Sequence, residues 1–488
     1  MDLEGISFET LEAVKKAQTS GITSTTGIYG VDLTALVQLI PVVTPFRNQI
    51  GRVSSPDGAL QTQWRALTNV NNQQPNPAVP FDYAGGLSLV DEQNVFAPYN
   101  PIALDGRVTQ DSMDLAKGYA DALALETINT LNQLMIGEDK LLIGAQNYAL
   151  PAIATPVLQT STSGGTIAAT TAVFVKVQAR TGGNYSFGGS AIASSAATIT
   201  TGSGSTNSVS ATVAAVKGAV AYDWFVSPNG SAYFYYTTTV INAVTVTAIP
   251  GSDNAVPNFP EMSPTVPTIA VSDGSGVDYE FNGLLAGILG DYGANSVVTP
   301  GSGITSGAQW LSLDGAQLAV TGQTIAQFDE ILLNLWNSVN LSPTAVMMNA
   351  QQAQDVSVGL LANGSAQTYL TVPDADGRAN ISAGGYVSGY LNNASGGQRI
   401  RVEVHPHLPP GTIVFRSDKV PFPGSNINNV FEVRTLRDYS QFNYGANRIP
   451  NVAGGGPRTD FEIRSIETLV NRAPVACAVI SNIAPGVA

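Results

Sequence analysis

The sequence predicts an α+β protein that carries an inserted all-β sandwich. Three observations lead to this prediction. One long helical pattern runs from Arg107 to Ile143, with apolar residues three and four positions apart. Residues 155–268 are rich in Ser, Thr, Gly and Ala, and they contain short strand patterns separated by turn signals. Residues 269–488 alternate helix and strand patterns and end in a β-rich region.

The long helical pattern predicts a single helix over about residues 109–143. Thr109 is a suitable N-cap, and Asp111 and Asp114 suit the positive end of the helix dipole. No proline interrupts the pattern. A single helix of this length exceeds what a compact domain usually needs. We therefore expect this helix to act as a supporting rod.

The composition excludes several classes of function. The 488 residues are 44% hydrophobic and only 12% charged, and the net charge is −14 without any run of Lys or Arg. Nucleic-acid readers and membrane-surface binders need concentrated positive charge, so both classes are disfavoured. No apolar run reaches the length of a membrane-spanning helix, and the acidic N-terminus lacks the apolar core of a signal peptide. We expect a soluble chain made in a cytoplasm.

The region before the helix has little material for a core of its own. Residues 1–45 read as an arm whose scattered apolar residues need a partner surface. Strand-like pieces flank the turn-rich stretch Asn71–Gly86, which predicts a two-stranded ribbon over about residues 60–100. Because a lone ribbon is only marginally stable in water, we expect it to lie against another molecule.

The polar insertion predicts an independent antiparallel sandwich of about seven strands. Its expected strands are Thr171–Ala179, Ala196–Thr200, Ser208–Val216, Val220–Ser227, Ala232–Thr237 and Ala243–Ile249. Its expected core residues are Trp224, Tyr222, Phe234 and Val175. The segment KGAVAYDWFVS resembles the central strand of immunoglobulin-like and fibronectin-type-III modules, although no cysteine pair is present.

Helices and strands alternate in the region that follows. Helices are expected at Tyr279–Leu289, Thr324–Val339 and Ala350–Ala362. Strands are expected at Thr344–Asn349, Arg399–His405, Gly411–Arg416, Asn429–Tyr439 and Phe461–Val470. Pro406, Pro409 and Pro410 predict a tight bend before Gly411.

Candidates for chemistry are few. His405 and His407 could face one way on a strand, but a metal would need a third ligand from elsewhere, and a structural role is expected. The single Cys477 is expected to be buried in an apolar strand. Residues Asp374–Gly377 lack the closing glutamate of a calcium loop and predict a solvated turn. We therefore predict no catalytic, cofactor-binding or metal-binding residues, no cofactor and no enzymatic activity.

The order of these elements resembles a known family. An arm, a long ribbon, a spine helix, a mixed α/β domain and returning strands resemble the major capsid protein of tailed bacteriophages, the Hong-Kong-ninety-seven fold. The stretches VHPHLPPGTIVFRSD and FEIRSIETLVNRAPVACAVI resemble its strand–bend–strand and its final strand. The resemblance implies an arm at 1–45, a peripheral domain at 46–154, an axial domain at 269–400 and return strands at 401–488. The immunoglobulin-like sandwich expected at 155–268 is an insertion that the basic fold lacks.

The same resemblance implies a structural function. Many copies would associate into pentamers and hexamers and close an icosahedral shell around double-stranded DNA, within a virion assembled in the cytoplasm of a host bacterium. Portal proteins, and scaffold or cement proteins, would be partners, and a membrane would not. Some relatives join a ribbon lysine to a neighbour's asparagine, but this chain has no lysine between Lys16 and Lys117. Two alternatives remain: an encapsulin-like compartment shell, and a surface adhesin or decoration protein built on the sandwich.

Overall fold

The structure is a computed structural model. It describes residues 43–55, 60–69, 77–85, 91–116, 121–290, 309–322, 324–363, 371–373, 379–381, 387–420, 427–447 and 458–487. Most of the predicted arm and the stretch Asp374–Gly377 lie outside the described residues. None of the described helices is long and apolar enough to cross a membrane.

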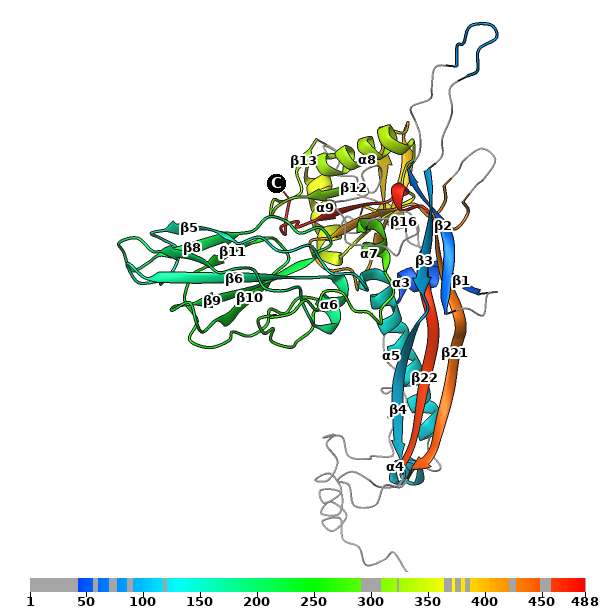
Figure 1. Cartoon of the computed structure of the whole chain (residues 1–488), viewed down its shortest axis with the longest axis horizontal. Coiled ribbons are helices and arrows are strands. Elements are labelled where there is room, and N and C mark those ends of the chain that lie inside the picture. Colours follow the sequence, from blue (N-terminus) through cyan, green and yellow to red (C-terminus); the bar gives the residue numbers. More distant parts are fainter. Residues whose placement is uncertain are drawn as a thin grey trace, which may run out of the picture. The chain divides into compact units, whose positions relative to one another are not determined.

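The chain divides into two compact units. One includes Leu104–Leu134 and Gln441–Ile463, and the other consists of Val43–Ala103, Met135–Ser440 and Arg464–Ala488. The first unit holds α4 (Gln110–Ala116) and parts of four longer elements. These are β4 (Asn100–Thr109), α5 (Ala122–Gly144), β21 (Phe431–Asn447) and β22 (Arg458–Asn471). Three of them form a sheet with β1 (Gly51–Ser54), in the order β1-β21-β22-β4 (Figure 1).

The long helical pattern forms two helices rather than the single predicted helix. Residues up to Thr109 belong to strand β4, and α4 and α5 are separate helices. The Thr109 hydroxyl accepts from the Ser112 N–H at 3.3 Å, so its predicted capping role is confirmed. The break arises because the Asp121 carboxylate accepts from the N–H groups of Leu123 and Ala124, at 3.0 and 3.2 Å, and caps a new helix.

The predicted ribbon is formed by β2 (Gln61–Asn69) and β3 (Asp91–Pro98), which pair antiparallel. The base of this ribbon packs on the chain's own core and not on another molecule. Trp64, Ala66 and Val95 are buried in one apolar cluster with Tyr148, Ala286 and Val470. The Trp64 indole N–H also donates to the carbonyl of Asn471 at 2.9 Å. The expectation that the whole ribbon lies against a neighbour is therefore wrong for its base.

Seven strands of the insertion form two sheets, with orders β10-β9-β6-β7 and β11-β8-β5 (Figure 1). Their bounds are β5 Val157–Ser161, β6 Ala172–Arg180, β7 Ala197–Thr200, β8 Ser208–Thr212, β9 Ala221–Ser227, β10 Phe234–Thr239 and β11 Ala243–Val246. The six predicted strands are confirmed to within a few residues, and β5 was missed because its side chains are mostly exposed and polar. A likeness of this sandwich to immunoglobulin modules stays a prediction.

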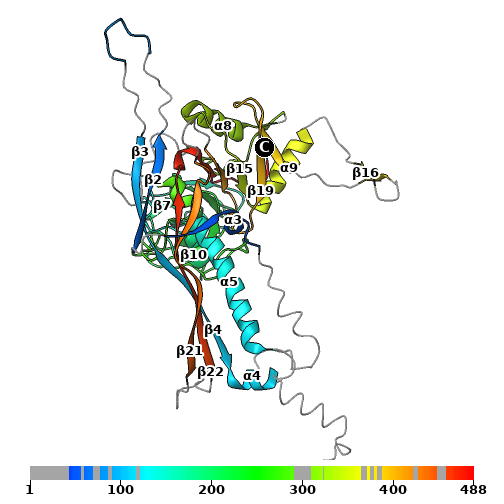
Figure 2. The same cartoon turned by 90° about the vertical axis from the view of Figure 1, so that its right-hand side faces the viewer.

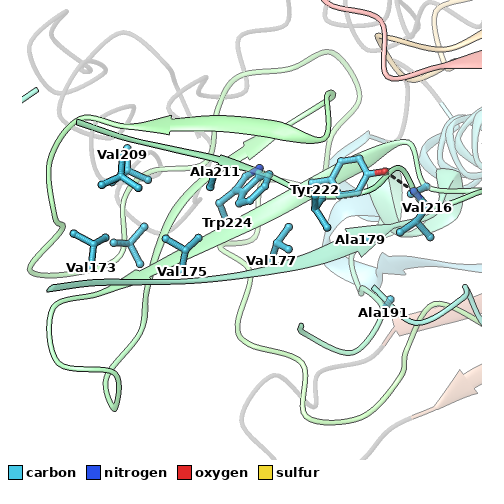
Figure 3. Packing of buried hydrophobic residues seen from close by; sticks show 14 of the residues in the cluster. Val173, Val175, Val177, Ala179, Ala191, Val209, Ala211, Val216, Tyr222 and Trp224 are labelled. Atoms are coloured by element: carbon cyan, nitrogen blue, oxygen red, sulfur yellow. Dashed lines mark hydrogen bonds between the residues drawn. The ribbon is translucent and has the colours of Figure 1, made fainter. Parts of the chain in front are cut away.

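One apolar cluster fills the sandwich (Figure 3). Trp224, Tyr222 and Val175 are fully buried in it, as predicted, and the Val216 N–H donates to the Tyr222 hydroxyl at 3.0 Å. Phe234 is wrong as a core residue, because it is only half-buried. The fully buried aromatic residue of that strand is its neighbour Tyr235, which is not part of this cluster and lies edge-on to Phe225 at 6.0 Å between ring centroids.

The sheet that contains β9 is covered on its second side as well. There the Asp223 carboxylate accepts from Arg180 Nε at 2.8 Å and from the Thr238 hydroxyl at 2.6 Å. The chain that leaves the sandwich closes this side: the Thr268 carbonyl accepts from the Gln178 amide at 3.2 Å. This side of the sheet therefore holds a buried ion pair that is hydrogen-bonded to neighbouring side chains.

The α/β body is built on a six-stranded sheet with the order β12-β23-β20-β15-β19-β18. Figure 2 shows β15 and β19 of this sheet with α8 and α9 near them. The strands are β12 Gln309–Ser312, β15 Ala345–Met348, β18 Gly389–Asn392, β19 Gln398–Val404, β20 Ile413–Arg416 and β23 Ala478–Ser481. The helices are α7 Leu284–Leu289, α8 Ala326–Val339 and α9 Ala350–Asn363, which confirms the three predicted helices with a shorter first one. The remaining elements of the described residues are short: α3 Pro45–Gln49, α6 Gly182–Phe187, β13 Val320–Thr321, β14 Thr324–Ile325, β16 Thr371–Pro373, β17 Ala379–Ile381 and the 3-10 turn η1 Pro474–Ala476.

Candidate assembly surfaces and the buried charge cluster

The tip of the ribbon, residues 77–85, is bare. Phe81 is 98% exposed and Tyr83 is 71% exposed, and Val79 beside them is also exposed. The Tyr83 N–H donates to the Pro80 carbonyl at 3.2 Å and closes a turn with Phe81 and Asp82 at its centre. Large apolar side chains in a cluster with no cover of their own chain mark a surface made for contact with another molecule.

A buried charge cluster joins several elements of the second compact unit. Arg52 on β1 binds Glu138 of α5 through one guanidinium nitrogen and Glu467 of β22 through another, the latter at 2.6 Å. Arg47 of α3 binds Glu138 as well, at 2.6 Å, and both carboxylates are fully buried. The Tyr439 hydroxyl also donates to Glu138. The cluster thereby ties two helices to three strands of one sheet.

Burial sets the protonation of Glu138. Removal from water, together with the neighbouring carboxylate of Glu467, raises the pKa of its carboxyl to about 7, although Arg52 and Arg47 oppose the shift. A carboxyl with such a pKa can be a general acid in an open cleft. Here it has no exposed surface, so the arrangement supports packing rather than catalysis on an outside substrate.

The two histidines, His405 and His407, lie beside this cluster. His405 Nδ1 accepts from the N–H of His407 at 3.2 Å, and its Nε2 lies 3.2 Å from the carboxylate of Asp139. The Phe46 N–H also lies 3.3 Å from Nε2, so both ring nitrogens of His405 are within hydrogen-bond distance of backbone N–H groups and neither is open to a metal. His407 Nε2 lies 3.1 Å from the Val43 carbonyl, and burial lowers the pKa of its imidazole. Throughout the described part of the chain, no group of three or more His, Cys, Asp or Glu side chains could hold a metal ion.

Cys477 is fully buried, as predicted, between η1 and β23. Burial raises the pKa of its thiol to about 12, so the reactive thiolate is absent at neutral pH. A thiol that is both buried and protonated has no nucleophilic role.

Sequence reasoning missed the charge cluster because its members are far apart in the chain. One local signal was present: Glu138 and Asp139 interrupt the apolar stretch LMIGEDKLLIG. Charged residues are rarely buried without partners, so an adjacent acidic pair inside an apolar stretch indicates buried arginines elsewhere. The stretch alone does not say which arginines these are.

Comparison with solved structures finds similar chains along nearly the full length. A capsid chain of cyanophage A-1(L) is 11% identical, has a TM-score of 0.45, and covers 95% of this chain and 98% of that chain. A chain of Mycobacterium phage Cain is 9% identical with a TM-score of 0.36 and 98% coverage of both chains. The SrpI encapsulin of Synechococcus elongatus PCC 7942 is 11% identical with a TM-score of 0.36, and covers 96% of this chain and 95% of that chain. No protein-family model and no curated protein matches the sequence.

The described elements follow one order along the chain: a paired ribbon, a long helix, a two-sheet insertion, an α/β body and returning C-terminal strands. Apart from the insertion, this is the element order of the tailed-phage major capsid fold that the sequence resembles.

Proposed function

We propose that this chain is the major capsid protein of a tailed bacteriophage. Copies of it associate into pentamers and hexamers and close an icosahedral head shell around double-stranded DNA. Assembly takes place in the cytoplasm of the host bacterium, with a portal protein at one vertex and with a scaffold or cement protein where the shell needs one. The role is structural and not enzymatic.

One observation carries this proposal: the ribbon is anchored at its base and bare at its tip. Trp64 holds the base in the chain's own core, whereas Phe81 at the tip is almost fully exposed and Tyr83 is largely exposed. A rigid support that presents uncovered aromatic side chains is suited to reach a neighbouring subunit. When identical subunits contact each other through different surfaces, the contacts close a shell if the geometry permits closure.

The charge of the chain agrees with a container for DNA. Because the net charge is −14, the copies do not bind the phosphate backbone tightly, and the genome can move during packaging. Packaged DNA would then be held without sequence readout. The inserted sandwich is proposed to project from the shell and to stabilise contacts between capsomers.

Electron microscopy of the purified full-length chain tests the proposal. We expect closed particles of uniform size, which sediment far faster than a 50.7 kDa monomer. Particles from the native source should contain DNA that resists nuclease. Protein cargo in place of DNA would favour the encapsulin-like alternative. A chain that stays monomeric at all concentrations, with and without its neighbouring gene products, would contradict a shell function.

A further inference from the structure

A polar cavity of about 330 Å³ is lined by residues of the α/β body and by the segment 49–51. Its charged lining residues are Arg401, Arg416, Asp418 and Lys419. The rest of the lining is polar or apolar and comprises Gln49, Ile50, Gly51, Asn428, Asn429 and Phe431. The cavity is therefore a mixed site with cations, amides and one aromatic wall.

Four of the charges near the cavity cancel one another. Asp418 binds Arg401 at 3.0 Å and Arg416 at 3.3 Å. Glu403 binds the same two arginines, at 3.3 and 2.9 Å. Two positive and two negative groups thus form a closed ring with no net charge. The Nε of Arg416, in a side chain only 2% exposed, has no hydrogen-bond partner among the described residues.

Lys419 is the one charged lining residue that does not belong to this ring of ion pairs. It is exposed on the cavity wall, and none of the described side chains pairs with its ammonium group. The cavity therefore presents one net positive charge on a chain whose total is −14. A single carboxylate balances that charge, whereas a phosphate dianion would add unbalanced charge next to Asp418 and Glu403. The exposed amides of Asn428 and Asn429 are further donors suited to a carboxylate.

A matching group is displayed on the ribbon tip. Asp82 is exposed and lies between the exposed Phe81 and Tyr83, at the corner of the turn that the Tyr83 N–H closes. Its φ of 69° holds it in the left-handed region, so the turn fixes where the carboxylate points. Since Phe81 is 98% exposed, the tip does not fill the cavity of its own chain.

We infer that the ribbon tip of one copy docks in this cavity of a neighbouring copy, with Asp82 opposite Lys419. The carboxylate completes the charge balance, and an aromatic side chain of the tip lies against the wall formed by Phe431. The occupant is a second copy of this chain, because the tip holds an exposed carboxylate between two exposed aromatic side chains, which matches the one uncompensated cation and the aromatic wall of the cavity. This inference rests on the proposed shell function and names one of its contacts.

A charge exchange between copies tests the pairing. Asp82→Lys and Lys419→Glu should each raise the protein concentration at half-assembly about tenfold, because each places like charges in the contact. The double variant should return to within about threefold of the wild type, since the pair is restored with reversed signs. Asp82→Asn, which keeps the left-handed turn, should give an intermediate loss. Asp278→Lys is the matched control, because Asp278 is another exposed carboxylate, beside the exposed Tyr279 and outside the ribbon; it should leave assembly unchanged, and a tenfold loss there would make this segment and not the tip the occupant.

Thermal unfolding of unassembled subunits should be the same for all these variants, because both residues are exposed in the single chain. A double variant that assembles no better than the worse single variant overturns the pairing, and so do single variants with normal assembly. Lys419 would then pair with an acidic residue of another segment, or it would have no partner in the assembly. If the wild type itself forms no particles, the proposed function fails, and this is distinguishable from a failure of the pairing alone.

Discussion

Glu138 and Glu467, both fully buried, share one guanidinium. Arg52 binds one carboxylate through Nη1 and the other through Nη2, and no solvent reaches either acid. Two like charges in such a place are tolerated only because a cation lies between them. The ion pairs therefore fix the position of α5 relative to β1 and β22 within one unit.

Arg52→Met should destabilise the chain strongly. It leaves two buried carboxylates without their shared partner, and breaking a buried pair in this way costs about 3–5 kcal/mol. Urea unfolding of the unassembled subunit measures the loss. Arg107→Met is the matched control, because the ion pair of Arg107 with Asp460 is solvent-exposed on the arginine side and is worth less than about 1 kcal/mol. Equal losses for the two variants would contradict a central role for the cluster.

Glu280 should make the stability of the fold depend on pH. Burial raises the pKa of its carboxyl from 4.5 to about 7, although the Gln146 N–H that donates to it opposes the shift. Between these two values the folded state binds more protons than the unfolded state, so the free energy of unfolding falls as pH rises from about 4.5 to about 7. Glu280→Gln keeps the acceptor and removes the charge, so this part of the fall should disappear, with a gain of about 1–3 kcal/mol at pH 8.

Thermal unfolding of wild type and variant across this pH range measures the difference. Glu330→Gln, at an exposed position, should keep the pH profile of the wild type. A profile for Glu280→Gln that is parallel to the wild-type profile would show that burial does not set the protonation of this carboxyl.

Local patterns predicted the elements whose partners are local or repetitive. Val173, Val175 and Val177 alternate with more exposed side chains, and this alternation was enough to identify β6 and the buried face of the sandwich. The break before α5 was missed because apolar spacing continues across it, and only the capping side chain of Asp121 reveals a second start. The spacing of apolar residues shows which face of a helix is buried, but it does not show where one helix ends and the next begins.

Contacts between distant segments could not be predicted in the same way. Nothing near Trp64 in the sequence points to the Asn471 carbonyl, so the ribbon looked unsupported. The partner of Glu138 is likewise set by the tertiary fold and not by spacing. For the candidate surfaces, the sequence indicated the ribbon tip through its turn residues, whereas the cavity around Lys419 needs segments that only the fold brings together.

Trp64→Ala and Phe81→Ala should distinguish the structural role of the ribbon's base from the assembly role of its tip. Truncating Trp64 removes a buried indole and its hydrogen bond, so the subunit should lose about 3–5 kcal/mol of stability. Truncating Phe81 removes a side chain that lies in water, so subunit stability should stay within about 0.5 kcal/mol. Assembly should suffer in both variants. Loss of stability in Phe81→Ala would show that the tip packs on its own chain.

The assembled shell should not be covalently joined through the ribbon. No lysine lies between Lys16 and Lys117, so the ribbon offers no amine for an isopeptide bond. Particles boiled in sodium dodecyl sulfate should give one band at 50.7 kDa on a denaturing gel. A ladder of heavier bands would contradict this expectation and would direct attention to lysines outside the ribbon.

Excision of residues 157–266 in favour of a short Gly-Ser linker should leave a chain that folds and still assembles, at reduced stability. The chain leaves and returns side by side, because the Leu150 N–H donates to Ser275 Oγ at 2.8 Å and the Val277 N–H donates to the Gln146 carbonyl at 3.0 Å. None of the six strands of the body's sheet comes from the excised residues. The α/β core should therefore survive the cut.

The reduced stability follows from contacts that cross the cut. Leu150 is buried in the sandwich cluster, and the Asn242 amide donates to Asp314 at 3.1 Å. Lys140 also loses its partner Glu261, bound at 2.7 Å. Leu150→Ser in the excised chain should recover part of the loss, because it removes the apolar side chain that the cut exposes. Negative-stain microscopy and thermal unfolding of both variants measure assembly and stability. A chain that fails to fold with either residue at position 150 would show the sandwich to be an inseparable part of the core, and its projection from the shell as a separate module would then be untenable.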